Sequence, residues 1–270
     1  MPGNGFGADA HVRPGGNPTE RWLAYREVNP RARLRMFCFP YAGGGASIYR
    51  GWAASLPPDL EICPVQLPGR ESRMRDQPFS HCEEMVPAVA DALRPYMGLP
   101  FVFFGHSMGG LIGFELAREL RRRGQTLPLH LFVSGRRSPD LPAREEPIHD
   151  LPEPEFLVKL RELNGTPEEV LQHEELMRLL IPLLRADFAV NETYTYTEAE
   201  PFDFGISAFG GLGDVEVTRE DVEAWRGQTR GRFRMRMLPG DHFFIHGSKN
   251  LILEAVSRDL AEIAATALSR

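Results

Sequence analysis

Ten residues decide the fold of this chain: Pro100-Phe101-Val102-Phe103-Phe104-Gly105-His106-Ser107-Met108-Gly109. The first half, 100–104, is an uninterrupted apolar run and is typical of a short buried strand. The second half has the Gly-x-Ser-x-Gly form of a nucleophile elbow, a sharp turn that exposes a serine above the end of a sheet. Apolar residues then recur at helical spacing as far as Gly124, a typical helix stop. A strand before Ser107 and a helix behind it therefore predict a catalytic serine, with a tight turn that Ser107 merely caps as the alternative.

A serine nucleophile needs an acid and a histidine base, which follow it along the chain in that order. His242 is the candidate base, because it lies in the loop directly after the strand-like stretch 232–238. Loops at the carboxyl ends of strands collect the functional groups of open α/β sheets. His246 is the competitor, but its place just before the last helix is typical of a helix start. His106, inside the elbow, is expected to point away from the nucleophile and to serve packing or to line the site.

Asp214 is the candidate acid. It ends the glycine-rich loop that follows the strand-like stretch 204–209, and one short helix and one strand fit between it and the histidine. Asp203 stands at the wrong end of the same strand, and Asp241 suits the turn beside the histidine. In this scheme the histidine takes the proton of the serine, while the acid fixes the imidazole tautomer and stabilises its charged form.

The oxyanion of such a reaction needs two backbone N–H donors. One is expected at Met108, which follows the nucleophile. The other is expected in the glycine-rich turn 40–45 behind the strand-like stretch 33–39, at Ala42 or, alternatively, at Tyr41. The same glycines could suit a phosphate, but neither Gly-Lys-Ser/Thr nor the G-x-G-x-x-G spacing is present.

Strand-like and helical segments alternate along the chain. This alternation predicts an α/β fold with a mostly parallel central sheet and helices on both faces. The expected strands are 33–39, 61–66, 100–104, 129–134, 204–209 and 232–238; the expected helices include one through Ile48, Tyr49, Trp52 and Leu56, another over 81–96, and one over 218–228 with Thr218 and Asp221 as its cap.

The alternation is interrupted between about 137 and 199, where the sequence predicts helices without strands, over 154–164 and 173–184. Thr166-Pro167-Glu168-Glu169 has the form of a capping box, and Pro182 is expected to kink or divide the second helix. Because long insertions into a compact fold are usually functional, we interpret this one as a lid over a substrate chamber, with a helix pair in the ordinary core as the alternative. The chamber residues would come from its apolar stripe: Leu176, Leu179, Leu180 and Leu183.

Several separate blocks carry a family resemblance that covers the chain from about residue 30 to its end. They are 37–44 (FCFPYAGG), 66–71 (QLPGRE), 105–110 (GHSMGG), 184–188 (LRADF), 192–194 (ETY) and 240–244 (GDHFF). In order and spacing the chain resembles the stand-alone type II thioesterases of polyketide synthases and nonribosomal peptide synthetases. It departs from many of them at Tyr41, in the glycine-rich turn 40–45, which we call the oxyanion turn.

The resemblance implies an α/β-hydrolase fold with a helical lid and a Ser107-Asp214-His242 triad. It also implies an editing hydrolase that releases wrong or stalled acyl groups from the phosphopantetheine arms of acyl and peptidyl carrier proteins. A small-molecule carboxylesterase or an acyltransferase would share every one of these residues, and a non-enzymatic binding module on the same fold is the third alternative. Basic residues that follow predicted strand ends are candidates for carrier contact: Arg70, Arg73, Arg75, Arg136 and Arg137.

Composition predicts a disordered tail over 1–20 and one domain over 21–270. The net charge of −6 argues against nucleic acid as a partner, and no apolar run reaches the length of a membrane span. Three cysteines without a framework spacing favour a reducing compartment, so we expect a cytoplasmic protein. We also expect it to be a monomer. Neither a metal-ligand pattern nor a cofactor motif is evident, and none is expected.

Overall fold

The computed structural model describes residues 21–144, 146–163, 165 and 168–267. The expected tail 1–20 and the cap residues Thr166 and Pro167 lie outside the described residues. The described chain forms one six-stranded sheet in which every neighbouring pair of strands is parallel, as predicted. The order is β2-β1-β3-β4-β5-β6, with bounds β1 Leu34–Phe39, β2 Leu60–Pro64, β3 Phe101–His106, β4 His130–Ser134, β5 Gly205–Gly211 and β6 Phe233–Leu238.

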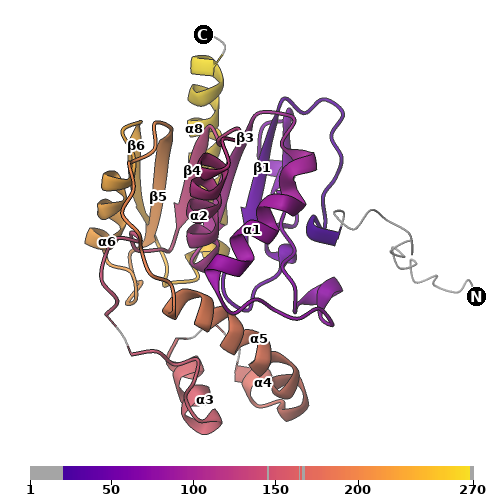
Figure 1. Cartoon of the computed structure of the whole chain (residues 1–270), viewed down its shortest axis with the longest axis vertical. Coiled ribbons are helices and arrows are strands. Elements are labelled where there is room, and N and C mark those ends of the chain that lie inside the picture. Colours follow the sequence, from indigo (N-terminus) through magenta and orange to yellow (C-terminus); the bar gives the residue numbers. More distant parts are fainter. Residues whose placement is uncertain (1–20, 145, 164, 166–167, 268–270) are drawn as a thin grey trace, which may run out of the picture.

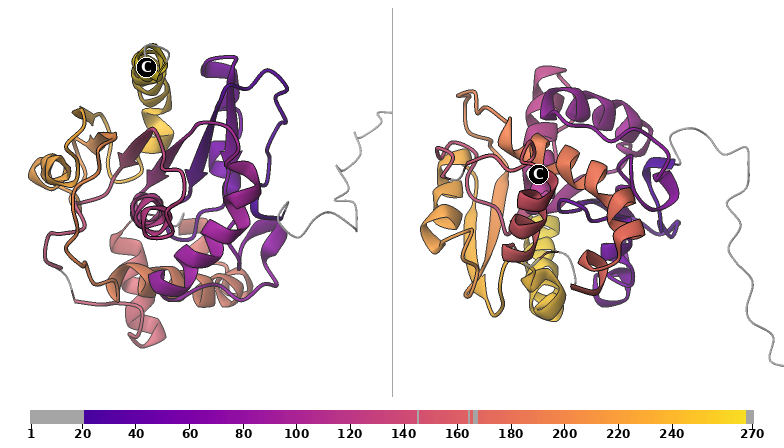
Figure 2. Two further views of the ribbon diagram at one scale, coloured as in Figure 1. Left: turned by 45° about the horizontal axis from the view of Figure 1, so that its top comes forward. Right: turned by 90° about the horizontal axis from the view of Figure 1, so that it is seen from below.

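Helices cover both faces of the sheet because its strands are apolar on both faces. Phe101 and Phe103 of β3 point into the core cluster under α1, α2 and α6, whereas Val102 and Phe104 point into the cluster under α8. Figures 1 and 2 show α1 and α2 on one side of the sheet and α8 on the other. These helices have the bounds α1 Cys82–Leu93, α2 Met108–Arg122, α6 Arg219–Glu223 and α8 Lys249–Ala267, and the short α7 spans Phe244–Gly247.

The predicted insertion is present between β4 and β5. It contains α3 Glu153–Glu162, α4 Glu168–Leu171 and α5 Glu174–Glu192. These helices pack on one another through their own hydrophobic cluster, which includes Phe156, Leu160 and Met177. Seen from below in Figure 2, they lie across the end of the sheet. Because the sheet is parallel, this is the end where the loops after β1, β3, β5 and β6 come together.

Two local expectations are wrong. The second helix of the insertion does not end at Leu184, and of the two effects expected of Pro182, a kink or a division, the division is wrong: α5 runs unbroken from Glu174 to Glu192. The proline lies on the exposed side, where the loss of one intrahelical hydrogen bond can be compensated by water. The helix expected through Ile48 to Leu56 consists of two 3₁₀ turns, Ala46–Tyr49 and Ala53–Ser55, because Gly51 between them has a left-handed φ of 73°.

The helices expected over 81–96 and 218–228 each end in a 3₁₀ turn. Further 3₁₀ turns span Glu71–Arg73, Arg94–Tyr96 and Ala224–Gln228. Thr218 and Asp221 form the predicted capping box at the start of α6. Among the described residues, no helix is both long and apolar enough to cross a membrane.

Candidate active site

Ser107 occupies a strained turn between β3 and α2. Its backbone has φ 51° and ψ −116°, a conformation that residues with a side chain rarely adopt. The two flanking glycines are required by close approach: a Cβ on Gly105 would stand 2.0 Å from the carbonyl oxygen of Gly109, and one on Gly109 2.0 Å from that of Phe39. The turn therefore has the geometry of a nucleophile elbow, and the Gly-x-Ser-x-Gly spacing follows from steric exclusion.

Three side chains from three loops form one hydrogen-bonded chain. Ser107 Oγ lies 3.1 Å from His242 Nε2, and His242 Nδ1 lies 2.9 Å from Asp214 Oδ2. A carboxylate only accepts, so Nδ1 carries the imidazole proton and Nε2 is left to accept the hydrogen of the serine hydroxyl. The structure thus brings together the three residues that the sequence singled out, from the carboxyl ends of β3, β5 and β6.

The Asp214 carboxylate is fixed in place. Its side chain is fully buried, and Oδ1 accepts hydrogen bonds from the backbone N–H groups of Glu216 and Val217 at 2.9 and 3.0 Å. Because Oδ1 is held by the backbone, Oδ2 remains directed at the imidazole of His242. The glycine-rich loop after β5 therefore fixes the orientation of the Asp214 carboxylate relative to His242.

His242 is almost completely buried, and burial by itself lowers the pKa of an imidazole. The hydrogen bond to Asp214 and the negative charges of Glu216 and Asp214 outweigh this effect, so the pKa of His242 is raised above its ordinary value of 6.5. A buried imidazole that binds a proton more readily than usual suits a base that must take one from a hydroxyl.

The competing candidates lie elsewhere. His246 Nε2 lies 2.9 Å from the hydroxyl oxygen of Tyr41, and Asp241 accepts a hydrogen bond from the Phe243 N–H within its own turn. Asp203, before the start of β5, is exposed and pairs with Arg230. None of these three acids and bases contacts Ser107 among the interactions of the described residues.

In the turn after β1, the two candidate N–H groups differ from their neighbours in their hydrogen bonding. The N–H of Gly43 donates to Asp187 Oδ2 at 2.7 Å, and that of Gly44 donates to the Tyr41 carbonyl at 2.9 Å. Within the described part of the chain, neither Ala42 nor Tyr41 has an acceptor for its N–H. Met108, at the first position of α2, likewise has no intrahelical acceptor. The amides proposed from sequence therefore have no acceptor among the described residues.

One ion pair next to this turn was missed by the sequence interpretation, which assigned Arg70 to a surface for partner contact. Arg70 is only 4% exposed and makes a two-pronged contact with the carboxylate of Asp187 on α5, both N–O distances being 2.8 Å. Arg73 is also buried, over the ring of Trp22 and beside Asp76. The only sequence signal for this ion pair was that Arg70 and Asp187 each lie in a block that carries the family resemblance.

The four leucines of the expected chamber do not share one environment. Leu183 packs over Gly69 beside Pro78, and Leu180 contributes to the internal cluster of the insertion. Leu176 is half-buried, and Leu179 is 63% exposed. Contact of these side chains with an acyl group stays a prediction.

Comparisons with known proteins agree with this geometry. A family model described as a thioesterase domain matches residues 34–263. The gramicidin S biosynthesis protein GrsT of Aneurinibacillus migulanus is 47% identical over 91% of this chain and 96% of its own length. RedJ, a thioesterase from the prodiginine pathway of Streptomyces coelicolor, superposes with a TM-score of 0.78 at 41% identity, covering 84% of this chain and 86% of RedJ.

BorB, a type II thioesterase from the borrelidin biosynthetic cluster, superposes with a TM-score of 0.77 at 32% identity, covering 88% of this chain and 95% of BorB. The family-model match spans all six strands, the elbow and the loops that carry Asp214 and His242. The chain therefore belongs to the thioesterase family and groups with its type II members.

Proposed function

We propose that this protein hydrolyses acyl thioesters through a covalent acyl-enzyme on Ser107. The observation that carries the proposal is the continuous hydrogen-bonded chain from Ser107 Oγ through His242 to the buried carboxylate of Asp214. A serine hydroxyl is a weak nucleophile unless a base takes its proton as it attacks, and an oriented imidazole meets that need.

The reaction takes place in two halves. His242 Nε2 accepts the proton of Ser107 as Oγ attacks the thioester carbonyl carbon, and the resulting oxyanion is held by the N–H groups of Met108 and Ala42. The C–S bond then breaks, the thiol leaves with the proton from His242, and the acyl group remains as an ester on Ser107. In the second half, water loses a proton to His242 and attacks the ester, so the free acid departs and Ser107 regains its hydrogen.

The substrate class comes from the relatives. GrsT is a gramicidin S biosynthesis protein, and BorB belongs to a borrelidin cluster, so we assign this chain to polyketide or nonribosomal peptide assembly. Its substrates in that role are acyl groups on the phosphopantetheine arms of carrier proteins, and removal of wrong or stalled groups is an editing task. The insertion over 137–199, which lies across the end of the sheet, acts as the lid of this site.

The test is hydrolysis of a panel of acyl groups loaded on a carrier protein, followed by mass spectrometry of the carrier. The wild-type chain should return the carrier to its free thiol form. Ser107→Ala should lower turnover by several orders of magnitude without loss of folding, because only one small oxygen on a half-buried turn is removed. Turnover by the alanine variant at the wild-type rate would overturn the proposal, and faster turnover of free oxygen esters than of carrier thioesters would favour a carboxylesterase.

A further inference from the structure

We propose that Asp187, together with Arg70, is a positioning residue that holds the oxyanion turn in its working conformation. The inference rests on the proposed function, since it concerns the N–H of Ala42 in that turn. Asp187 lies on α5 of the insertion, whereas Arg70 lies in the loop after β2, so the contact joins the insertion directly to the catalytic end of the sheet.

The turn needs such support because it contains three consecutive glycines, Gly43, Gly44 and Gly45. Glycine loses more conformational freedom on ordering than any other residue, so an unsupported run of three would sample many conformations. Gly43 has a left-handed φ of 75°, and a Cβ there would stand 2.6 Å from a methyl carbon of Leu184. The glycines permit the close approach of α5, and other side chains must therefore fix their backbone.

Asp187 and Arg70 each hold one peptide group of this turn, on either side of the peptide that joins Gly43 to Gly44. Asp187 Oδ2 accepts the Gly43 N–H at 2.7 Å, and Arg70 Nη1 donates to the Gly44 carbonyl at 3.1 Å. The same two side chains pair with each other, and Arg70 Nε donates to the Pro68 carbonyl. Each group therefore fixes the other as well as the turn. Because the Gly43 N–H is committed to Asp187, the next free donor towards β1 is the N–H of Ala42.

The ion pair between Arg70 and Asp187 is buried from solvent, and this burial strengthens its hydrogen bonds. The side chains of Arg70 and Asp187 are 4% and 3% exposed. Hydrogen bonds to charged groups in such surroundings are stronger than those made in water, and a two-pronged guanidinium–carboxylate pair has a fixed planar geometry. Loss of the Asp187 carboxylate would release the Gly43 peptide and leave Arg70 without its partner.

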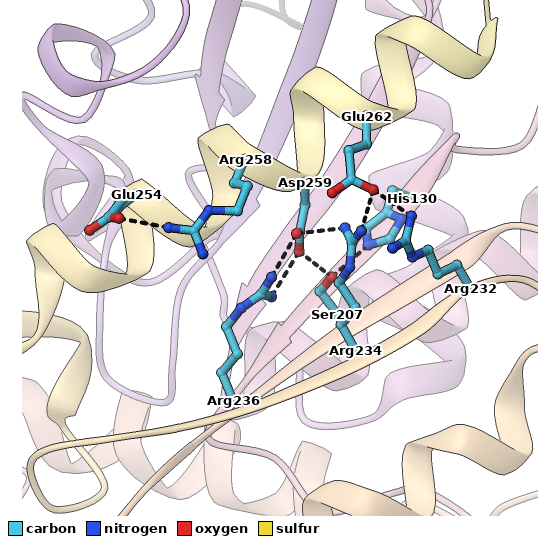
Figure 3. Close-up of polar contacts among 9 residues, drawn as sticks. All are labelled: His130, Ser207, Arg232, Arg234, Arg236, Glu254, Arg258, Asp259 and Glu262. Atoms are coloured by element: carbon cyan, nitrogen blue, oxygen red, sulfur yellow. Dashed lines mark hydrogen bonds and ion pairs between the residues drawn. The ribbon is translucent and has the colours of Figure 1, made fainter.

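A matched control exists on another part of the molecule. Asp259 of α8 is also fully buried and is held by Arg234 and Arg236 of β6 at N–O distances between 2.6 and 2.8 Å. Figure 3 shows this second cluster, in which Ser207 also donates to Asp259. It lies against α8 and has no contact with the oxyanion turn. Replacement of either aspartate therefore breaks a buried ion pair, but only Asp187 holds the turn.

The experiment compares Asp187→Leu and Asp187→Asn with Asp259→Leu and Asp259→Asn in the full chain. Thermal unfolding, kcat and KM for an acyl-carrier substrate, and amide hydrogen exchange of the segment 40–46 are measured for each variant. All four should unfold at lower temperature than the wild type. Asp187→Leu should lower kcat by about 10²-fold with little change in KM, because loss of an oxyanion donor acts mainly in the transition state.

Asp187→Asn retains an oxygen that can accept the Gly43 N–H, so its kcat should fall less than that of the leucine variant. Within this segment, exchange of the hydrogen-bonded amides of Gly43 and Gly44 should accelerate in Asp187→Leu and remain slow in both Asp259 variants. If Asp187→Leu does not fold, Arg70→Lys serves instead: the ammonium keeps the charge beside Asp187 but lacks the planar fork that also reaches the Gly44 carbonyl, and kcat should again fall.

Wild-type kcat and slow exchange in Asp187→Leu, or an equal fall of kcat in Asp259→Leu, would overturn the proposal and leave the ion pair a purely structural one. The exchange measurement does not require catalysis. Failure of the wild-type chain to hydrolyse thioesters would therefore refute the proposed function, whereas the exchange data would still decide whether Asp187 holds the turn.

Discussion

The imidazole of His106 donates from Nε2 to the backbone carbonyl of His242, 2.9 Å away. A carbonyl oxygen cannot donate, so this contact fixes the tautomer and leaves Nδ1 to accept the hydroxyl hydrogen of Ser134, also at 2.9 Å. Burial, together with the nearby His242, lowers the pKa of His106 far below 6.5, so the ring stays neutral. His106 thus supports the loop that carries His242.

We therefore expect His106→Phe to keep the ring volume but to lower kcat by about tenfold or more, because small displacements of a catalytic group are costly in rate. His106→Gln, which retains a side-chain N–H, should lose less. Steady-state kinetics and thermal unfolding of both variants check this prediction. Equal kcat in His106→Phe and the wild type would show that the contact does not position His242.

Asp214→Asn should give a folded but severely impaired enzyme. The amide cannot stabilise an imidazolium and can hold His242 in the wrong tautomer, and the corresponding change in a serine protease costs about 10⁴-fold in kcat. Asp203→Asn is the matched control, because Asp203 is exposed and distant from the serine. A damaging Asp203→Asn combined with a mild Asp214→Asn would refute the assignment of the acid.

The pH dependence follows from the raised pKa of His242. The base must be neutral to accept the serine proton, so kcat/KM should rise with pH through an apparent pKa above 6.5. In Asp214→Asn, burial is opposed only by the negative charge of Glu216, so the pKa of His242 should fall and this acidic limb should move to lower pH. The measurement is the pH profile of kcat/KM for both proteins. An acidic limb that stays in place in the variant would contradict the cause given for the shift.

The same pKa shift also affects stability, with a definite sign. A folded-state pKa above the unfolded value means that the native state binds the proton more tightly. The contribution of His242 to stability is therefore complete below pH 6.5 and is lost as the pH rises through the folded-state pKa. The free energy of chemical unfolding should be measured below pH 6.5 and above the folded-state pKa of His242. It should decrease between these two pH values in the wild type and decrease less in Asp214→Asn.

Local sequence signals were sufficient to predict the sheet and the three side chains that the structure brings together at the candidate site. Strands such as β3 are recognisable because buried parallel strands are continuous apolar runs, and the positions of Asp214 and His242 follow from the rule that functional loops leave the carboxyl ends of strands. The elbow is recognisable because steric exclusion leaves only glycine beside Ser107.

The contacts that orient the site could not be predicted in this way. Arg70 and Asp187 are 117 residues apart, and their pairing depends on how α5 packs back against the sheet. An arginine after a strand is also compatible with the surface, so its burial is decided by tertiary packing. The role of His106 was missed for a related reason: its partner is a backbone carbonyl, and backbone positions leave no trace in residue identity.

The last prediction concerns substrate size and the exposed leucine of the insertion. Leu179 is 63% exposed on α5, so Leu179→Trp should leave the unfolding temperature unchanged. If this face of the lid meets the acyl chain, the added ring should lower turnover of long acyl groups more than that of acetyl or propionyl groups, because a short group leaves the lid untouched. Leu251→Trp is the matched control, since Leu251 is 45% exposed on α8, on the opposite side of the sheet from α1 and α2. Kinetics with carrier proteins that bear acyl groups of increasing length provide the measurement. Equal effects of Leu179→Trp on short and long acyl groups would place the chain-length determinant elsewhere than on this face of α5.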